Sequence, residues 1–278
     1  TSFMQKIPFA SNLFKILLPL YPLAFESFDF SKFDLVISST TRFSKGIITK
    51  PKTLHICYIN STPRFLWHEN AKSHYLKDWQ HKIAKPVLFW LKRYDKAASA
   101  RPDFYIANSQ NVARRVKKDY SRDASVVYPY ADTDFFTPLA AEKNSKFLIA
   151  GGDYYLVVSR LVKWKRVDLA IKACSALNKN LIVVGFGPDE TRLKKLAQST
   201  IINQQSTIEF KDYVSREKLR ELYQNAQALI VTQEEDFGIS AVEANACGIP
   251  VLAYSRGGQK ETIIEGKTGE FFDDPIPE

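Results

Sequence analysis

Short apolar runs rich in β-branched residues alternate with longer amphipathic stretches through the first half of the chain. These runs predict strands at residues 34–39, 54–59, 104–108 and 125–128. The longer stretches predict helices at 72–99, where Pro86 is a candidate break, and at 109–120. Strands that alternate with helices favour a mostly parallel sheet with helices on both faces.

The alternation is more regular from residue 154 onward. Strands are predicted at 154–159, 181–185, 207–210, 228–232 and 251–254. Helices are predicted at 167–177, 189–198, 216–224 and 239–247, with a short helix near Glu261. The segment 137–152 is rich in Pro, Ala, Gly and polar residues and has no period, so it is the expected domain boundary.

Composition is consistent with two globular domains. The chain has 278 residues, of which 45% are hydrophobic and 25% charged, and this length suits two domains with separate cores. Two doubly wound sheets would place a ligand in the cleft between them, at the carboxyl ends of strands. Cys57, Cys174 and Cys247 are far apart and lack metal-ligand spacing, which favours a reducing, cytoplasmic environment and predicts no metal site.

Charge is unevenly distributed along the chain. Residues 1–145 hold 22 Lys and Arg against 12 Asp and Glu, whereas residues 146–278 hold 17 against 18. A basic half suggests an anionic partner such as phosphate, an acidic membrane or nucleic acid. The run 114–118 is the one clear basic cluster, and on a helix such a run is usually a solvated face. The apolar stretch 13–25 is interrupted by Lys15 and two prolines, which favours a buried element over a membrane span; a lipid-contacting surface is the alternative.

Two basic residues follow the predicted strand 154–159. Arg160 and Lys165 stand five positions apart across a turn at the carboxyl end of this strand. An Arg fork and a Lys point charge can together bind a diphosphate and stabilise charge on a leaving diphosphate. The alternative is a basic loop without a ligand.

Two glycine-containing loops are also candidates for backbone contact with a ligand. Gly185-Phe186-Gly187 follows a strand and opens a helix, but Glu190 stands where a dinucleotide-binding loop has its third glycine, which argues against an NAD site. Close approach of a nucleotide and a plain tight turn both remain open. Gly257-Gly258 offers backbone amides to an anion or sugar, or is a simple loop.

Acidic residues surround the predicted start of the helix at 239–247. Glu235 precedes that helix and Glu243 lies in its first turns. Free N–H groups at such a helix start bind phosphate, and carboxylates accept hydrogen bonds from sugar hydroxyls. Ser240 and Glu243 also have capping-box spacing, so Glu243 has a second, structural explanation. The triplet 236–238 spells the kinase magnesium motif, but the other kinase motifs are absent from the sequence.

Taken in order, these residues resemble family 4 of the retaining glycosyltransferases. The resemblance covers residues 154–272 and rests on a series of matches, namely Ser159-Arg160-Leu161 with Lys165, Gly185-Phe186-Gly187, 210–213, Glu235-Asp236-Phe237-Gly238 with Glu243-Ala244, 246–251, Gly257-Gly258 with Glu261, and Thr268-Gly269. The family has the GT-B fold, an α/β architecture of two Rossmann-like domains that face each other across a cleft. It uses a nucleoside diphosphate sugar as co-substrate and needs no metal for transfer.

The resemblance assigns roles to individual residues. Donor-binding residues would be Arg160, Lys165, Gly185, Val214, Phe237, Gly238, Ile239 and Glu243. Among them, Arg160 and Lys165 would bind the diphosphate and Glu243 the ribose hydroxyls. The loop 212–214 would lie against the base. Glu235 would lie beside the transferred sugar as a catalytic residue.

The first half resembles the mannosyltransferase-like enzymes of bacterial surface polysaccharide assembly, through 55–60, 64–67, 106–109 and 128–129. The second catalytic candidate, Asn60, stands where that subgroup has histidine, and an amide cannot shuttle a proton. Residues 1–145 would form the acceptor-side domain and 146–278 the donor domain. The resemblance also implies that the first domain is incomplete, without its opening strand and glycine-rich loop, and that the closing helix is missing.

The predicted function is transfer of a hexosyl group, with mannose as the candidate sugar, to a glycan or polyprenyl-linked acceptor. The alternatives are a storage-glucan or disaccharide synthase of the same fold and a non-catalytic nucleotide-sugar binder. The expected setting is the cytoplasm, with peripheral contact to an anionic membrane and no nucleic-acid partner. The isolated fragment is expected to have weak or no transfer activity.

Overall fold

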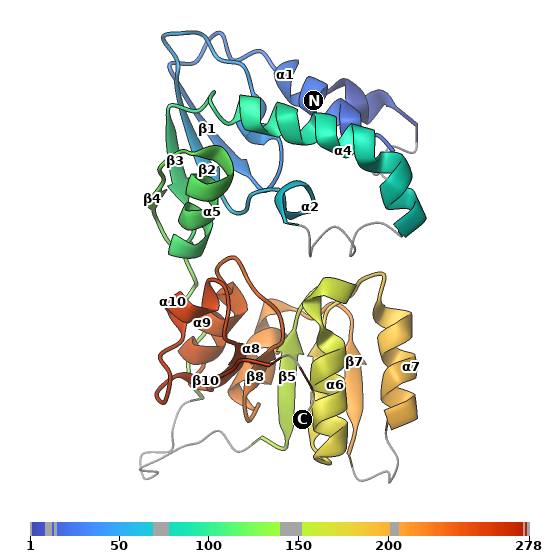
Figure 1. Ribbon diagram of the computed structural model, residues 1–278. Coiled ribbons are helices and arrows are strands. Elements are labelled where there is room, and N and C mark those ends of the chain that lie inside the picture. The colour runs from blue at the N-terminus through green and yellow to red at the C-terminus, as the bar shows by residue number, and fades with distance from the viewer. Residues whose placement is uncertain are drawn as a thin grey trace. The chain divides into compact units, whose positions relative to one another are not determined.

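The computed structural model describes residues 2–8, 13, 16–68, 78–139, 152–200, 206–274 and 276 (Figure 1). The chain forms two compact units, residues 1–128 and 129–278. They divide between Tyr128 and Pro129, before the boundary expected at 137–152, most of which lies outside the described residues. Residues 129–139 belong to the second unit because Phe135 and Phe136 pack on its core and Asp132 accepts a 2.8 Å hydrogen bond from Arg216.

The first unit contains a four-stranded parallel sheet in the order β1-β2-β3-β4. Its strands are β1 (Leu35–Thr40), β2 (Leu54–Ile59), β3 (Phe104–Ala107) and β4 (Ser125–Val126), which confirms the four predicted strands with a shorter fourth. Its helices are α1 (Tyr21–Glu26), α2 (Arg64–Trp67), α4 (Asp78–Ala98) and α5 (Gln110–Tyr120). Single 3₁₀ turns occur at Phe3–Lys6, Leu18–Leu20 and Ser44–Gly46.

Helices cover one face of this first sheet. Cys57, Ile59 and Tyr105 point to that face and pack against α5. On the other face, Leu35, Ile37, Leu54 and Phe104 are exposed, and the remaining apolar side chains of β2 and β3 are half-buried. The expectation of helices on both faces is therefore wrong for the described part of this unit. The cause is topological: the strands follow one another in a single direction, so right-handed crossovers deliver every helix to the same side.

Helix α4 runs without a break through Pro86, contrary to the predicted interruption. Pro86 is exposed, so water can satisfy the carbonyl group that the missing proline N–H leaves unbonded. The predicted start of this helix, residues 72–77, lies outside the described residues. None of the described helices combines the length and apolar composition that crossing a bilayer needs.

The second unit contains a six-stranded parallel sheet in the order β10-β9-β8-β5-β6-β7. Its strands are β5 (Tyr154–Val158), β6 (Asn180–Val184), β7 (Ile208–Lys211), β8 (Leu229–Val231), β9 (Val251–Tyr254) and β10 (Gly269–Phe272). Its helices are α6 (Val167–Ala176), α7 (Glu190–Thr200), α8 (Arg216–Gln224), α9 (Ile239–Ala246) and α10 (Gln259–Thr262), with a 3₁₀ turn at Lys163–Lys165. All predicted elements of this half are confirmed, and β10 is an addition.

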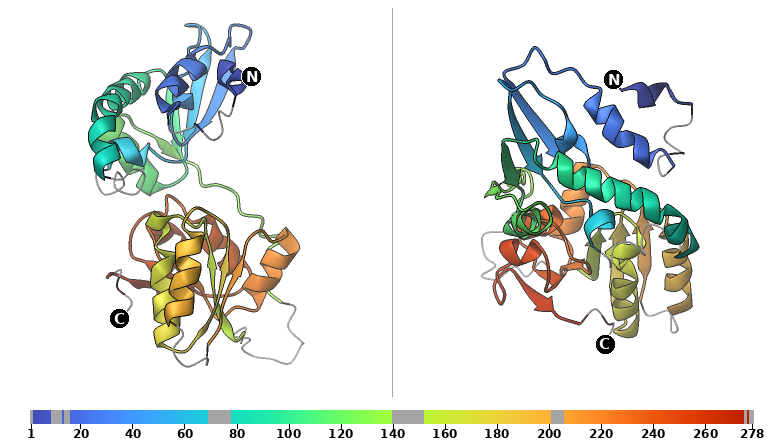
Figure 2. Two further views of the ribbon diagram at one scale, coloured as in Figure 1. Left: turned by 90° about the vertical axis from the view of Figure 1, so that its right-hand side faces the viewer. Right: turned by 45° about the horizontal axis from the view of Figure 1, so that its top comes forward.

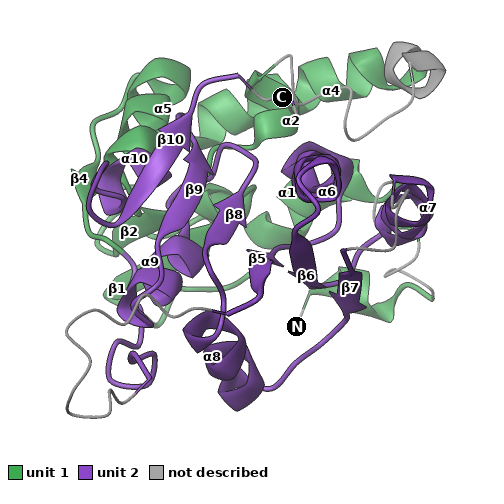
Figure 3. Cartoon of the chain, turned by 90° about the horizontal axis from the view of Figure 1, so that it is seen from below, with its two compact units in different colours: residues 1–128 green, residues 129–278 purple. Residues whose placement is uncertain are grey.

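Both faces of the second sheet are covered, as predicted. Helices α6 and α7 lie on one side and α8 and α9 on the other (Figure 3). Neighbouring residues on one strand accordingly enter different cores: Leu156 packs with α8 and α9, and Val157 with α6 and α7. The chain leaves β5 toward β6 and β7 and then returns to β8 on the other side of β5. This reversal makes the carboxyl ends of β5 and β8 the topological switch point, where open α/β sheets bind ligands.

Candidate functional site

An ion pair joins the two loops at the switch point. Lys165 ends the 3₁₀ turn after β5, and its Nζ pairs with Oε1 of Glu235, which follows β8. The side chains are 11% and 20% exposed, respectively. The Lys165 carbonyl also accepts a 2.7 Å hydrogen bond from Thr232 Oγ1. Lys165 is therefore fixed in place and its charge is partly neutralised, rather than being the freely available cation that the sequence suggests.

Two glutamines that the sequence analysis did not single out hold Glu235 in position. Gln233 Nε2 donates to the same carboxylate oxygen that Lys165 contacts. The backbone N–H of Glu235 donates to Oε1 of Gln259 at 2.9 Å. Gln259 is fully buried, and its Nε2 donates at 2.8 Å to the carbonyl groups of Gln233 and Tyr254. Because a buried amide is costly unless paired, this network fixes the loop that carries the carboxylate.

The Gly257-Gly258 loop packs directly on the Glu235 backbone. Gly258 N–H donates to the Glu235 carbonyl at 2.8 Å, so this amide is not open to a ligand. A Cβ atom on Gly257 would lie 2.3 Å from the same carbonyl oxygen, and Gly257 has φ +90°. The glycines therefore allow two loops to touch. This favours a structural explanation over the direct ligand contact that the sequence left open.

Gly185 and Gly187 serve a similar purpose between the loops after β5 and β6. A Cβ atom on Gly185 would lie 1.9 Å from the Ser159 carbonyl oxygen, and one on Gly187 would lie 2.2 Å from that of Leu161. Leu161 N–H donates to the Phe186 carbonyl at 3.0 Å. The close approach is thus between two segments of this chain, and it positions the turn that carries Lys165.

Arg160 and Val214 are not part of the hydrogen-bond network that the described residues form around Glu235. Arg160 is exposed, and its guanidinium contacts no acidic side chain in the described part of the chain. Val214 is half-buried and packs against the core between the sheet and α8. Neither residue forms a hydrogen bond with Lys165 or Glu235. The structure therefore links only some of the predicted donor-binding residues to Glu235.

The start of α9 is an open helix N-terminus. Gly238 is its N-cap with φ +90°, and no side chain caps it. Ala241 N–H donates to the Gly238 carbonyl at 3.0 Å, whereas no described residue accepts from the N–H of Gly238 or Ile239. Phe237 is buried, which anchors the turn. Unbonded N–H groups and the helix dipole make this position suitable for an anion.

Glu243 does not cap α9, so the capping-box explanation is wrong. The cap position is Gly238, and Glu243 Oε2 instead accepts a 3.1 Å hydrogen bond from Tyr223 Oη of α8. Burial raises the pKa of the Glu243 carboxyl; the Tyr223 hydrogen bond and the charge of Arg216 offset part of that rise. A carboxylate kept partly desolvated without a cation in direct contact is a good acceptor for hydroxyl groups.

Comparison with known proteins identifies the family of this site. The family "Glycosyl transferases group 1" matches residues 140–278, which is half of the chain and includes every residue of the site described above. The chain belongs to this family. The group 1 match places Lys165, Glu235 and Glu243 within the domain that defines the family.

Individual relatives agree with this assignment. The chain is 26% identical over 265 residues to "Uncharacterized glycosyltransferase MJ1069" of Methanocaldococcus jannaschii, covering 88% of this chain and 64% of the relative. It is 32% identical over 183 residues to a D-inositol 3-phosphate glycosyltransferase of Mycobacterium sp. (strain KMS), covering 62% and 41%. The chain thus spans less than two thirds of the length of these group 1 relatives.

Solved structures show the same fold. A sucrose-phosphate synthase from Thermosynechococcus elongatus superposes with a TM-score of 0.70 at 21% identity, covering 97% of this chain and 68% of that one. Anabaena Alr3699/HepE in complex with UDP-glucose superposes with a TM-score of 0.65 at 17% identity, covering 100% and 71%. The predicted GT-B fold class is confirmed.

In the first unit, Asn60 lies directly after β2. Its Nδ2 donates to Ser39 Oγ at 3.1 Å, and its carbonyl accepts from Asn108 Nδ2 at 3.1 Å. Asn60 thereby links the carboxyl ends of β1, β2 and β3, which is where a parallel sheet presents ligand contacts. Within the described ranges, no group of acidic, histidine and cysteine side chains could hold a metal ion.

Proposed function

We propose that the protein to which this group 1 chain belongs is a retaining glycosyltransferase. It transfers a hexosyl group, with mannose as the candidate, from a nucleoside diphosphate sugar to a glycan or lipid-linked acceptor. The observation that carries this proposal is the Lys165–Glu235 pair at the switch point, beside the open N-terminus of α9. A fixed cation, free N–H donors and a fixed carboxylate are what a sugar diphosphate requires.

Each group has a distinct task in this proposal. The N–H groups of Gly238 and Ile239, together with Lys165 and Arg160, stabilise the charge that grows on the departing diphosphate. Glu235 accepts hydrogen bonds from sugar hydroxyls, and Glu243 from the ribose.

The transfer itself breaks the bond between the anomeric carbon and the diphosphate oxygen. The acceptor oxygen bonds to that carbon from the leaving-group side, and its proton passes to the diphosphate, so the anomeric configuration is retained. No metal or cofactor is part of the proposed reaction.

Asn60 supports a second candidate, a nucleotide-sugar binder without transfer activity. Its amide is committed to Ser39 and cannot take a proton near neutral pH. Donor binding and turnover must therefore be measured separately. Binding is tested by thermal stabilisation with a panel of nucleoside diphosphate sugars. Transfer is then tested with the donor that stabilises most, on this chain and on a longer version of the protein. Stabilisation without transfer in both would favour the binder, and absence of stabilisation by any donor would refute both candidates.

A further inference from the structure

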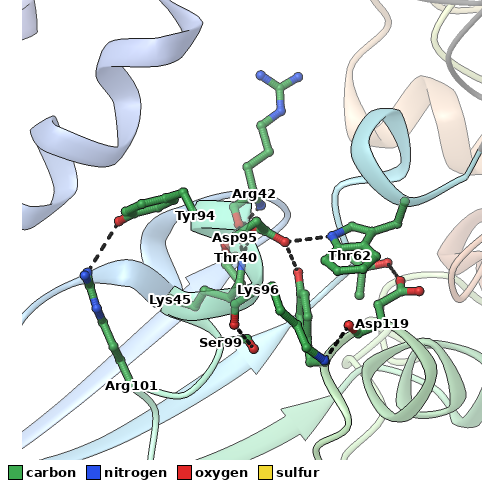
Figure 4. A network of polar contacts seen from close by, with 12 residues as sticks. Thr40, Arg42, Lys45, Thr62, Tyr94, Asp95, Lys96, Ser99, Arg101 and Asp119 are labelled. Carbon is green, nitrogen blue, oxygen red and sulfur yellow. Dashed lines mark hydrogen bonds and ion pairs between the residues drawn. The ribbon is translucent and has the colours of Figure 1, made fainter. Parts of the chain in front are cut away.

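The inner face of α4 is fixed by a buried polar network. Asp95, near the end of the helix, is fully buried and pairs with Lys45. Its other oxygen accepts 2.8 Å hydrogen bonds from Trp67 Nε1 and Tyr120 Oη (Figure 4). Leu91, one turn earlier, is also fully buried. Because rotation of the helix would break these contacts, its opposite face must remain outward.

The outward face combines apolar and basic side chains in two adjacent rows. Ile83, Val87 and Trp90 have i, i+4, i+7 spacing and are 71%, 40% and 46% exposed. The second row has spacing of four and contains exposed Lys85, Phe89 and Arg93. We define the α4 outer face as Ile83, Lys85, Val87, Phe89, Trp90 and Arg93.

Among the described side chains of α4, no exposed carboxylate balances the charge of this face. Between residues 83 and 98 the helix carries four cations, of which Lys92 and Lys96 join the two already named, and its one acid is the buried Asp95. A hollow of about 460 Å³ lies beside the face and is lined by Trp67, Phe89, Lys92, Arg93, Lys96 and Asp119. Asp119 in that lining is buried and accepts a 2.8 Å hydrogen bond from Thr62, so the accessible charge of the hollow is positive.

A neighbouring element extends the apolar surface. Helix α1 lies beside α4 in two views (Figures 1 and 2), and Tyr94 Oη donates to Glu26 Oε1 at 3.0 Å. Leu23 of α1 is 50% exposed, and Ile16, just before the 3₁₀ turn, is 75% exposed. Both belong to the stretch 13–25 whose sequence left open a contact with lipid. The exposed apolar side chains of α4 thus have exposed apolar neighbours on and just before α1.

We propose that the α4 outer face docks on an anionic lipid bilayer. Exposed Trp and Phe suit the headgroup region, and Lys and Arg beside them contact lipid phosphates. A second copy of this chain is a poor occupant because two such faces would repel each other. Nucleic acid would use the cations but leave Ile83, Val87 and Trp90 without a partner. The proposal does not depend on glycosyl transfer.

The test is co-sedimentation of the chain with phosphatidylcholine vesicles that contain or lack phosphatidylglycerol. We expect binding to the anionic vesicles that weakens as salt rises. Lys85→Gln with Arg93→Gln should reduce the partition coefficient by roughly 30-fold, because each cation contributes about fivefold and the two factors multiply. The matched control, Lys172→Gln with Lys179→Gln, removes the same charge from exposed positions of the second unit and should bind as the unmodified chain does.

The apolar part is tested separately with Phe89→Ser and Trp90→Ser against Leu177→Ser, an exposed apolar position of the second unit. Circular dichroism melts check that each variant is folded. The salt dependence of vesicle binding is measured on the unmodified chain, so it tests the proposal even if a variant does not fold. Equal binding to both vesicle types, no binding at all, or equal losses in the α4 and control variants would overturn the proposal. So would light scattering that shows the α4 variants disrupting a dimer.

Discussion

Replacing Glu235 with Gln is expected to lower stability as well as donor binding, because the carboxylate is half of an ion pair. A fully buried pair that loses one partner costs about 3–5 kcal/mol, whereas an exposed pair contributes about 0–1 kcal/mol. The side chains of Lys165 and Glu235 are 11% and 20% exposed, which lies between these cases. Glu235→Gln keeps an oxygen that can accept from Lys165 and Gln233. We therefore expect a loss of about 1–3 kcal/mol.

The loss should appear as a lower melting temperature of the second unit. For about 150 residues, each kcal/mol shifts the melting temperature by about 2–4 °C. Lys165→Met and the double variant complete a double-mutant cycle in urea unfolding, with an expected coupling of about 1 kcal/mol or more. Additivity within about 0.5 kcal/mol would refute the ion pair as an energetic unit.

Donor binding is measured on the same variants. Glu235→Gln should weaken the thermal stabilisation by a nucleoside diphosphate sugar more than the stabilisation by the nucleoside diphosphate alone, because Glu235 is assigned to the sugar. Equal weakening of both would contradict that assignment. Because both ligands are measured on the same variant, its lower stability without ligand affects the two results equally.

Three further predictions concern other residues. Gly187→Ala places a Cβ atom 2.2 Å from the Leu161 carbonyl oxygen and should lower the free energy of unfolding in urea by about 2–3 kcal/mol. The control, Gly266→Ala, has φ +74° but open space around its Cβ and should lower it by about 1 kcal/mol. Similar losses in the two variants would contradict the close loop contact. Burial raises the pKa of Glu243, so the folded wild-type chain holds this proton more tightly than the unfolded chain and should lose stability as pH rises from 4.5 through the raised pKa. In melts across pH, Glu243→Gln should remove this part of the dependence of melting temperature on pH. An unchanged pH dependence would refute the assignment to Glu243. Asn60→His should increase transfer by the longer protein if a histidine is needed there, and unchanged turnover would remove Asn60 from the mechanism.

Local patterns predicted most elements because period and turn residues act within a few positions. The strand β2 and the helix α8 were predicted at their observed ends, and β5 within one residue. The candidate break at Pro86 does not occur, because this proline is exposed and water can satisfy the carbonyl group that it leaves unbonded. The short β10 has too few residues for a period and exists because it pairs with β9.

The site was harder to predict than the elements. The positions of Arg160, Lys165 and Glu235 after strands made them candidates, and these roles stay predictions. The contact between Lys165 and Glu235 was not foreseen, because the two residues are 70 positions apart in sequence. The sequence offered little reason to select Gln259, because it is a single polar residue at the start of a short helix. Its importance comes from complete burial and three hydrogen bonds, which only tertiary structure reveals.

The uncovered face of the first sheet has a consequence for how the chain unfolds. Leu35, Ile37 and Phe104 stay in water in the folded first unit, whereas the strands of the second unit are packed between two layers of helices. The first unit therefore gains less from folding for each residue that it orders. Heating should separate the chain into two transitions, with β1 and β2 exchanging amide hydrogens before β5 and β8, and a single unfolding free energy would not describe it.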